Sequence, residues 1–179
     1  MRVITGTAGG RQLKTLPGNA VRPTADHVKE ALFNILQFDL EGRRVLDLFG
    51  GTGQLGIEAL SRGAREVVFT DLSKNSVTLI RENLKRCGLK AAVLQTDALS
   101  YLSLGEKFDI IFVDPPYDAG LYAPVLERIN AVDNLNEGGI IICESRAKEV
   151  LPDLLPPYRL LRRRRYGSMA LTFYTRSSE

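Results

Sequence analysis

"VLDLFGGTGQLG", residues 45 to 56, contains the change of pattern that decides the fold. Its first five residues, 45–49, are mostly apolar, as in a strand buried within a sheet. Gly50, Gly51 and Gly53 follow, where the backbone can bend tightly and approach a ligand because no Cβ atoms obstruct it. A helical pattern then begins at Leu55. This order of strand, glycine-rich loop and helix indicates the first unit of an α/β fold.

The same alternation continues through most of the chain. Strands are expected at residues 45–49, 66–70, 91–95, 108–113 and 140–144. Helices are expected between them at residues 55–61, 74–87, 98–103 and 121–132. Strands that alternate with helices in this way favour a parallel sheet with helices on both faces.

The two ends of the chain differ from this pattern. Residues 2–15 predict a short β-hairpin around a Gly9-Gly10 turn. Thr24 is then suited to be the N-cap of a helix whose apolar residues recur at helical spacing. Residues 158–176, "YRLLRRRRYGSMALTFYTR", predict an antiparallel hairpin that closes one edge of the sheet.

Length and composition indicate a single globular domain in a reducing cytoplasm. The chain has 179 residues, 44% hydrophobic and 25% charged, which we divide into an N-terminal extension (1–40) and a core (41–179). No apolar run approaches the ~18 residues of a membrane span, and no signal peptide is expected. Cys87 and Cys143 are far apart and offer no zinc pattern, so no metal is expected. The single histidine, His27, is expected on the surface.

Basic residues gather near both ends of a chain whose net charge is only +3. Seven Lys or Arg stand against four Asp or Glu in the first 44 residues, and Arg162 to Arg165 are consecutive. Such patches suit a polyanion, although a solvated strand or loop also explains a run of four arginines. The candidate phosphate contacts are Arg11, Lys14, Arg22, Arg162, Arg163, Arg164 and Arg165.

Acidic residues follow almost every predicted strand. Ligands of such sheets bind beyond the carboxyl ends of the strands, so these acids are expected around one site. They are Asp47, Asp71, Asp97, Asp114 and Glu144. Any one of them alone is explained as well by a helix cap or a solvated loop.

Two cofactors compete for the glycine loop. Gly51, Gly53 and Gly56 satisfy the GxGxxG pattern of dinucleotide-binding folds, with Asp71 about twenty residues later. That interpretation puts a pyrophosphate beside Asp47, where two like charges at ~4 Å repel by around 4 kcal/mol at an effective dielectric near 20. S-adenosylmethionine has a sulfonium and an ammonium and no phosphate, so it suits the acid better.

The S-adenosylmethionine interpretation gives the neighbouring residues distinct roles. Asp71 accepts hydrogen bonds from the ribose hydroxyls, and Asp97 accepts one from the adenine amino group. Leu72 and Ala98 pack beside the adenine. The cofactor residues predicted in these loops are Asp47, Phe49, Gly50, Gly51, Gly53, Asp71, Leu72, Asp97 and Ala98.

"FDIIFVDPPYD", residues 108–118, holds the predicted catalytic residues Asp114, Pro115, Pro116 and Tyr117. The two prolines cannot continue a sheet ladder, so the strand ends in a stiff corner. The Asp114 carboxylate and the Pro115 carbonyl can accept hydrogen bonds from the two N–H groups of an exocyclic base amine, which favours its change toward a tetrahedral nucleophile. Tyr117 can stack on the base and hold it in line with the methyl group.

Together these motifs resemble the RsmD family of class I methyltransferases, bacterial enzymes that methylate guanine N2 in 16S ribosomal RNA. The resemblance rests on "RPTADHVKEALFNIL", "VLDLFGGTGQLGIEALSRGA", "IIFVDPPYD" and "RRYGSMALTFY" and extends over nearly the whole chain. It implies a Rossmann-like, seven-stranded, mostly parallel sheet, with Asp114, Pro115 and Tyr117 at the target amine. It also implies that Arg22, Pro23 and Thr24 adjoin the cofactor or substrate pocket, although Thr24 is explained equally by a helix cap. The implied cofactor is S-adenosyl-L-methionine, and the implied substrate of the monomer is 16S rRNA in a small subunit or an assembly intermediate.

Three functions stay open at this point. The first is guanine-N2 methylation of rRNA, and the second is adenine-N6 methylation of DNA or RNA by the same acceptors. The third is a dinucleotide-dependent oxidoreductase, for which the chain offers no further residue for hydride or proton transfer. Because only about forty N-terminal residues and the final hairpin lie outside the catalytic sheet, a folded RNA recognised by its shape is the favoured substrate.

Overall fold

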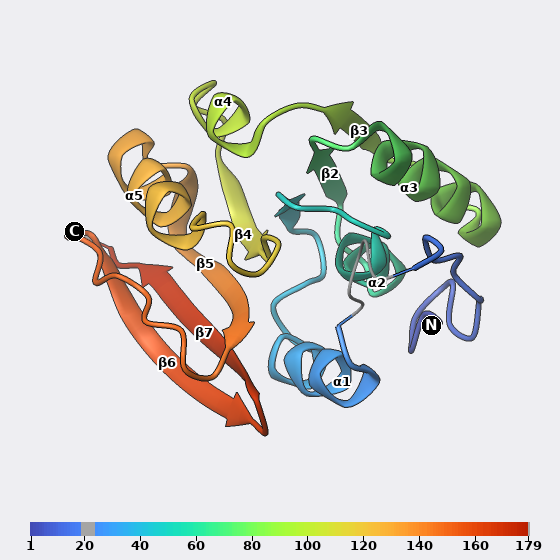
Figure 1. Ribbon diagram of the computed structural model, residues 1–179, viewed down its shortest axis with the longest axis horizontal. Coiled ribbons are helices and arrows are strands. Elements are labelled where there is room, and N and C mark those ends of the chain that lie inside the picture. The colour runs from blue at the N-terminus through green and yellow to red at the C-terminus, as the bar shows by residue number, and fades with distance from the viewer. Residues whose placement is uncertain (19–23, 179) are drawn as a thin grey trace.

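The computed structural model describes residues 1–18 and 24–178 (Figure 1). The helices are α1 (Asp26–Ile35), α2 (Gln54–Ser61), α3 (Lys74–Cys87), α4 (Ala98–Leu102) and α5 (Tyr122–Val132). The strands are β1 (Arg44–Asp47), β2 (Glu66–Asp71), β3 (Ala92–Gln95), β4 (Phe108–Val113), β5 (Leu135–Arg146), β6 (Tyr158–Tyr166) and β7 (Met169–Arg176). Within the described residues, every helix is too short or too polar to cross a membrane.

The strands form one seven-stranded sheet in the order β3-β2-β1-β4-β5-β7-β6. Strands β1 to β5 pair in parallel, whereas β7 is antiparallel to both β5 and β6. This confirms the predicted sheet and its antiparallel C-terminal hairpin. From β1 the chain proceeds toward β3 on one side and later returns to β4 and β5 on the other. The loops after the adjacent strands β1 and β4 therefore lead to helices on opposite faces of the sheet, α2 and α5. This is the switch point, where ligands bind in such folds.

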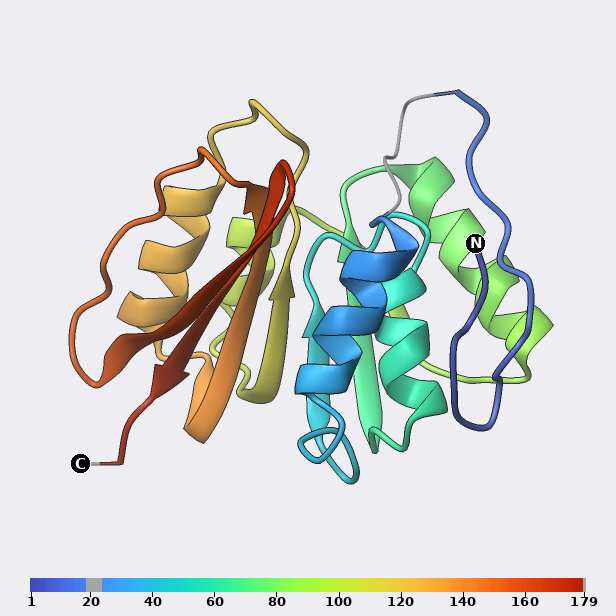
Figure 2. The same ribbon diagram turned by 90° about the horizontal axis from the view of Figure 1, so that it is seen from below.

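Alternate residues of each central strand supply two separate hydrophobic layers. Val45 and Ile110 pack with α1, α2 and α3 on one face, which we call the α1 face. Leu46 and Ile111 pack with α4 and α5 on the other, the α5 face. Figure 2 shows α1 and α5 on opposite sides of the sheet. Because both faces are covered, these strands are apolar at consecutive positions.

Helix α2 approaches the sheet closely because Gly56 has no side chain. A Cβ atom there would lie 2.3 Å from Cε1 of Phe69 on β2. The glycine therefore serves packing in addition to any role of its loop. Substitution by alanine would overfill this contact.

The predicted N-terminal hairpin has a single antiparallel bridge, between Arg2 and Gln12, in place of two regular strands. Backbone hydrogen bonds also join its two arms. In addition, the Glu58 carboxylate of α2 accepts hydrogen bonds from the backbone N–H groups of Ile4 (2.8 Å) and Thr5 (3.1 Å). The segment is thus held both by its own backbone and by a helix.

The prediction that Thr24 caps α1 is wrong. The N-cap of α1 is Ala25, and no side chain caps the helix. The Thr24 hydroxyl instead donates a 2.7 Å hydrogen bond to Oε2 of Glu144 on β5. The Thr24 hydroxyl therefore bonds to Glu144, far along the chain, and not to the backbone at the start of α1.

Several strand boundaries also differ from the predictions, and two of the differences concern β1 and β5. β1 ends at Asp47, so Phe49 lies in the loop. β5 begins at Leu135, five residues before the predicted start, because Leu135 pairs with Phe108 of β4. The intervening polar and glycine residues concealed this extension.

A buried ion-pair network joins α1, α2 and the N-terminal segment. Lys29 and Glu58 are fully buried, and their charged groups lie 3.5 Å apart. Lys29 also donates to the carbonyl of Arg2 (2.8 Å), while Arg62 donates to Glu58 (2.9 Å). Burial lowers the pKa of Lys29, whereas Glu58 raises it.

We expect Glu58→Ala to lower the free energy of unfolding by roughly 3–5 kcal/mol, because it leaves the Lys29 charge buried without its partner. Lys29→Met should cost clearly less, since methionine fills the space and Glu58 keeps Arg62 and two backbone donors. Urea denaturation followed by circular dichroism would measure both losses. Equal losses would contradict this ordering.

Candidate active site

A pocket of about 370 Å³ opens at the carboxyl edge of the sheet, around the switch point. Its volume lies within the roughly 300–1,000 Å³ of small-ligand sites. It is lined by every predicted catalytic and cofactor residue except Gly53 and Thr24. The structure thus brings together groups that come from the loops after β1, β2, β3 and β4.

The glycine loop is held by backbone hydrogen bonds. Gly50 donates to the carbonyl of Thr70 (2.8 Å), and Gly53 donates to the carbonyl of Gly50 (2.7 Å). Gly53, with a φ of 82°, occupies the N-cap of α2 in the left-handed region that favours glycine. Gly51 donates to Oδ2 of Asp71 at 2.9 Å. Gly53 therefore shapes the turn without lining the pocket.

Asp47 is a buried carboxyl group at the end of β1. Only 2% of the residue is exposed, and Oδ2 accepts a 3.0 Å hydrogen bond from the backbone N–H of Gly56. Burial raises the pKa of Asp47 to about 7; the Gly56 hydrogen bond opposes this shift and the Asp71 charge adds to it. The group is therefore suited to a cationic ligand that would restore its ionised form.

Asp114, at the end of β4, lies in the same acidic environment. Burial raises its pKa well above the ordinary value, and the charges of Glu144 and Asp47 raise it further. Asp47, Asp114 and Glu144 all line the pocket, and we call them the carboxylate cluster. Within residues 1–18 and 24–178, no group of three His, Cys, Asp or Glu side chains is suited to hold a metal ion.

Glu144 belongs to this cluster although the sequence singled it out only as a strand-end acid. It is 6% exposed and accepts the Thr24 hydrogen bond. The buried Tyr122 hydroxyl donates to the Glu144 backbone carbonyl at 2.7 Å, which fixes the end of β5. Burial, followed by the charge of Asp114, raises the pKa of Tyr122. Thr24 thus does not line the pocket itself but is hydrogen-bonded to Glu144, which does.

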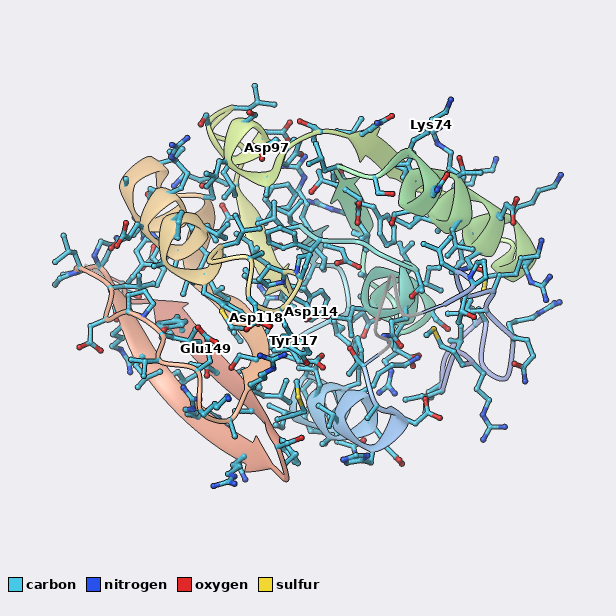
Figure 3. The ribbon with its side chains drawn as sticks, in the orientation of Figure 1. Lys74, Asp97, Asp114, Tyr117, Asp118 and Glu149 are labelled. Carbon is cyan, nitrogen blue, oxygen red and sulfur yellow. The ribbon has the colours of Figure 1, made fainter. Side chains whose placement is uncertain are left out.

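Tyr117 is held at the mouth of the pocket. Its hydroxyl donates to Sδ of Met169 on β7 at 3.2 Å. The guanidinium carbon of Arg146 lies 4.7 Å from the centre of the Tyr117 ring, and Arg146 forms a 2.8 Å ion pair with Asp118. Figure 3 shows Asp114, Tyr117 and Asp118 close together at the end of β4. Arg146 is a neighbour of the site that the sequence did not indicate.

The acids predicted at the adenosine end also support the backbone. Asp71 accepts from the N–H groups of Gly51 (2.9 Å) and Ser73 (2.8 Å). Asp97 caps α4 by accepting from the Ser100 N–H at 2.9 Å. It lies beside α4, well apart from Asp114 (Figure 3). Asp97 is therefore a helix cap and also a residue of the pocket wall.

The N-terminal segment contributes a pocket residue that the sequence did not indicate, Leu16. Asn83 of α3, which is fully buried, holds this segment through two hydrogen bonds to the backbone of Lys14, at 2.8 and 3.0 Å. The same amide donates to the carbonyl of Thr52 in the glycine loop at 2.9 Å. No local pattern predicts this link between distant parts of the sequence.

The candidate phosphate contacts do not form one surface. Arg11 and Lys14 lie in the N-terminal segment near α3, where Lys14 pairs with Glu82 at 3.0 Å. Arg162 to Arg165 lie on β6, at the opposite edge of the sheet (Figure 1). Arg22, like Pro23, lies outside the described residues.

The sequence matches a family model described as "Conserved hypothetical protein 95" over residues 1–175. YlbH of Bacillus subtilis is 38% identical over 180 residues, which cover 97% of this chain and 98% of YlbH. Ribosomal RNA small subunit methyltransferase D of Escherichia coli K12 is 32% identical, and the match covers 100% of this chain and 91% of the Escherichia coli protein. The solved structure of yhhF from Escherichia coli has a TM-score of 0.88 at 31% identity, covering 100% of this chain and 99% of yhhF.

The raised pKa of Asp47 makes stability depend on pH. Because the folded pKa of about 7 exceeds the unfolded value, the contribution of Asp47 is complete below the unfolded pKa and is lost as pH rises through 7. We expect Asp47→Asn to unfold with nearly wild-type free energy near about pH 4 and to be more stable by up to about 4 kcal/mol at about pH 8. Urea denaturation across this range measures the difference. Asp153→Asn, an exposed change of the same kind, is the control; a pH-independent difference for Asp47→Asn would refute the prediction.

Proposed function

We propose that this chain, which belongs to the RsmD family described as "Conserved hypothetical protein 95", transfers a methyl group from S-adenosylmethionine to N2 of a guanine in 16S ribosomal RNA. The observation that carries the proposal is the carboxylate cluster beside Tyr117, in a pocket that the glycine loop also lines. The Escherichia coli relative named ribosomal RNA small subunit methyltransferase D supports a small-subunit rRNA substrate.

The charge of the pocket supports S-adenosylmethionine over a dinucleotide. Buried carboxyl groups with raised pKa values gain from a nearby positive charge and lose from a nearby phosphate. The sulfonium and ammonium groups of S-adenosylmethionine supply that charge. Asp71, Leu72, Asp97 and Ala98 then line the adenosine end.

Asp114 and Pro115 act as acceptors for the target amine. The sulfonium offsets part of the repulsion within the carboxylate cluster, so cofactor binding favours the ionised form of Asp114. Its carboxylate and the Pro115 carbonyl accept the two N–H bonds, which directs the nitrogen lone pair at the methyl carbon. The C–N bond forms as the C–S bond breaks, and sulfur keeps the electron pair as a neutral thioether. The product amine then loses its proton to the solvent or to Asp114.

Family membership supports guanine N2 over adenine N6, since the same acceptors suit either amine. We propose that phosphate contacts come from Arg11 and Lys14 near α3, from Arg22, and from the run 162–165 on β6, within which Arg162 and Arg164 are the contacts because Arg163 and Arg165 are bound to backbone carbonyls. Recognition by RNA shape follows from the small size of the chain outside the sheet. A cytoplasmic monomer that acts on the small subunit or an assembly intermediate completes the proposal and rests on the family alone.

Asp114→Asn should lower the rate of methyl transfer by roughly 10²–10³-fold, because it removes a charged acceptor at the reacting nitrogen. Binding of S-adenosylmethionine, measured by calorimetry, should persist. The assay uses labelled cofactor and small subunits that lack base methylation, followed by mass spectrometry of the nucleosides. N2-methylguanosine formed by the wild type alone supports the proposal. N6-methyladenosine, or undiminished transfer by the variant, would overturn it.

Tyr117→Phe and Tyr117→Ala separate stacking from the hydroxyl contact. The phenylalanine variant keeps the ring and should retain most activity, although it loses the contact with Met169. The alanine variant should lose about 10–100-fold in kcat/KM for RNA, because stacking on a base contributes roughly 1–3 kcal/mol. A similar loss in both variants would assign the effect to the hydroxyl group and contradict the stacking role.

A further inference from the structure

The four arginines of β6 do not share one environment, because strand alternation places them on opposite faces of the sheet. Arg162 and Arg164 pair with Phe173 and Leu171 of β7, which pack in the layer of the α1 face. Arg163 and Arg165 pair with Thr172 and Ala170, so they lie on the α5 face. The run therefore consists of two pairs with different neighbours.

The pair on the α5 face is bound to the protein's own backbone. Arg163 Nη2 donates to the carbonyl oxygens of Ala147 (2.8 Å) and Glu149 (3.0 Å), in the loop after β5. Arg165 Nε donates to the carbonyl of Gly167 in the β6–β7 turn at 2.8 Å. These guanidinium groups hold local structure.

The pair on the α1 face is exposed and lies in line with the active site. Glu144 of β5 pairs with Leu171, which in turn pairs with Arg164, so a pocket residue and this arginine lie on the same face two strands apart. One step nearer the carboxyl end of β5, Arg146 pairs with Met169, the residue that contacts Tyr117. Arg162, two residues before Arg164 on β6, is the next residue on this face. Its guanidinium carbon lies 5.9 Å from the centre of the Phe173 ring.

We infer that Arg146, Arg164 and Arg162 form a track on the α1 face for the RNA strand that leads to the target base at Tyr117. This inference rests on the proposed function and names which surface receives the RNA. Residues two apart on a strand are roughly 6.6 Å apart, so Arg162 and Arg164 can contact successive phosphates of an extended strand. The partner chemistry is a phosphate backbone because Arg162 and Arg164 present exposed guanidinium groups on the edge strand β6.

The test compares two double variants with the same change of charge, Arg162→Ala/Arg164→Ala and Arg163→Ala/Arg165→Ala. The probe is unmodified full-length 16S rRNA made by transcription, and its Kd is measured over a range of KCl concentrations. Loss of the track pair should weaken binding roughly tenfold near 0.1 M salt and reduce the slope of log K against log salt by about 1.4–1.8, the value for two phosphate contacts. Loss of the other pair should leave the slope unchanged and lower the melting temperature.

Several results would overturn the track. One is an equal loss of slope in both double variants, and another is weaker binding of the track variant with an unchanged slope. Unchanged RNA binding by the track variant would assign the face to another partner. Methyl transfer by the wild type is measured separately, so RNA that binds along the track without being methylated refutes the proposed function but not the track.

Discussion

Burial of carboxyl groups beside like-charged neighbours is the constraint on which the site depends. Asp47, Asp114 and Glu144 lie at or near the carboxyl ends of three adjacent parallel strands, β1, β4 and β5, and all three line one pocket. Burial is the main cause of the raised pKa values of Asp47 and Asp114; the charge of Asp71 adds to the shift of Asp47, and the charges of Glu144 and Asp47 add to that of Asp114. The protein therefore maintains an arrangement that is unfavourable by itself and that a cationic ligand would relieve. Such an arrangement is typical of a functional site rather than of a structural core.

The rest of the fold serves to hold these acids in place. The switch point separates the loops after β1 and β4, which leaves room for a ligand between them. Gly56 lets α2 approach β2 and donates to Asp47, so one residue satisfies packing and the carboxyl group together. Thr24 and Tyr122 bond to the side chain and the backbone of Glu144, from the two sides of the sheet. Asp47 and Glu144 thus have supports that a local sequence pattern does not reveal.

The sequence predicted the features that depend on local interactions and missed those that depend on contacts between distant residues. The strands, the glycine loop and the corner at Asp114 are local features, set by apolar runs, glycine and proline, and the structure confirms the sheet they predict. Thr24 was misassigned because its acceptor, Glu144, is 120 residues away and outcompetes the local helix end. The N-terminal segment has one bridge in place of two strands, and it is also held by Glu58 of α2, which lies 54 residues from Ile4 in the sequence. Arg146 was missed because only the register of β5 on β7 places it beside Tyr117.

The same electrostatics connect the proposed reaction to the exchange of cofactor. Before transfer, the sulfonium offsets the repulsion within the carboxylate cluster and so contributes to binding. Transfer moves the methyl group to the amine and leaves sulfur as a neutral thioether, so that contribution disappears while the ammonium of the same molecule remains. The charges of Glu144 and Asp47 then act on Asp114 without that compensation and raise its affinity for protons. A pocket built on crowded acids therefore distinguishes the cofactor from its product by charge, at the atom that reacts, and this favours release of the product over its retention.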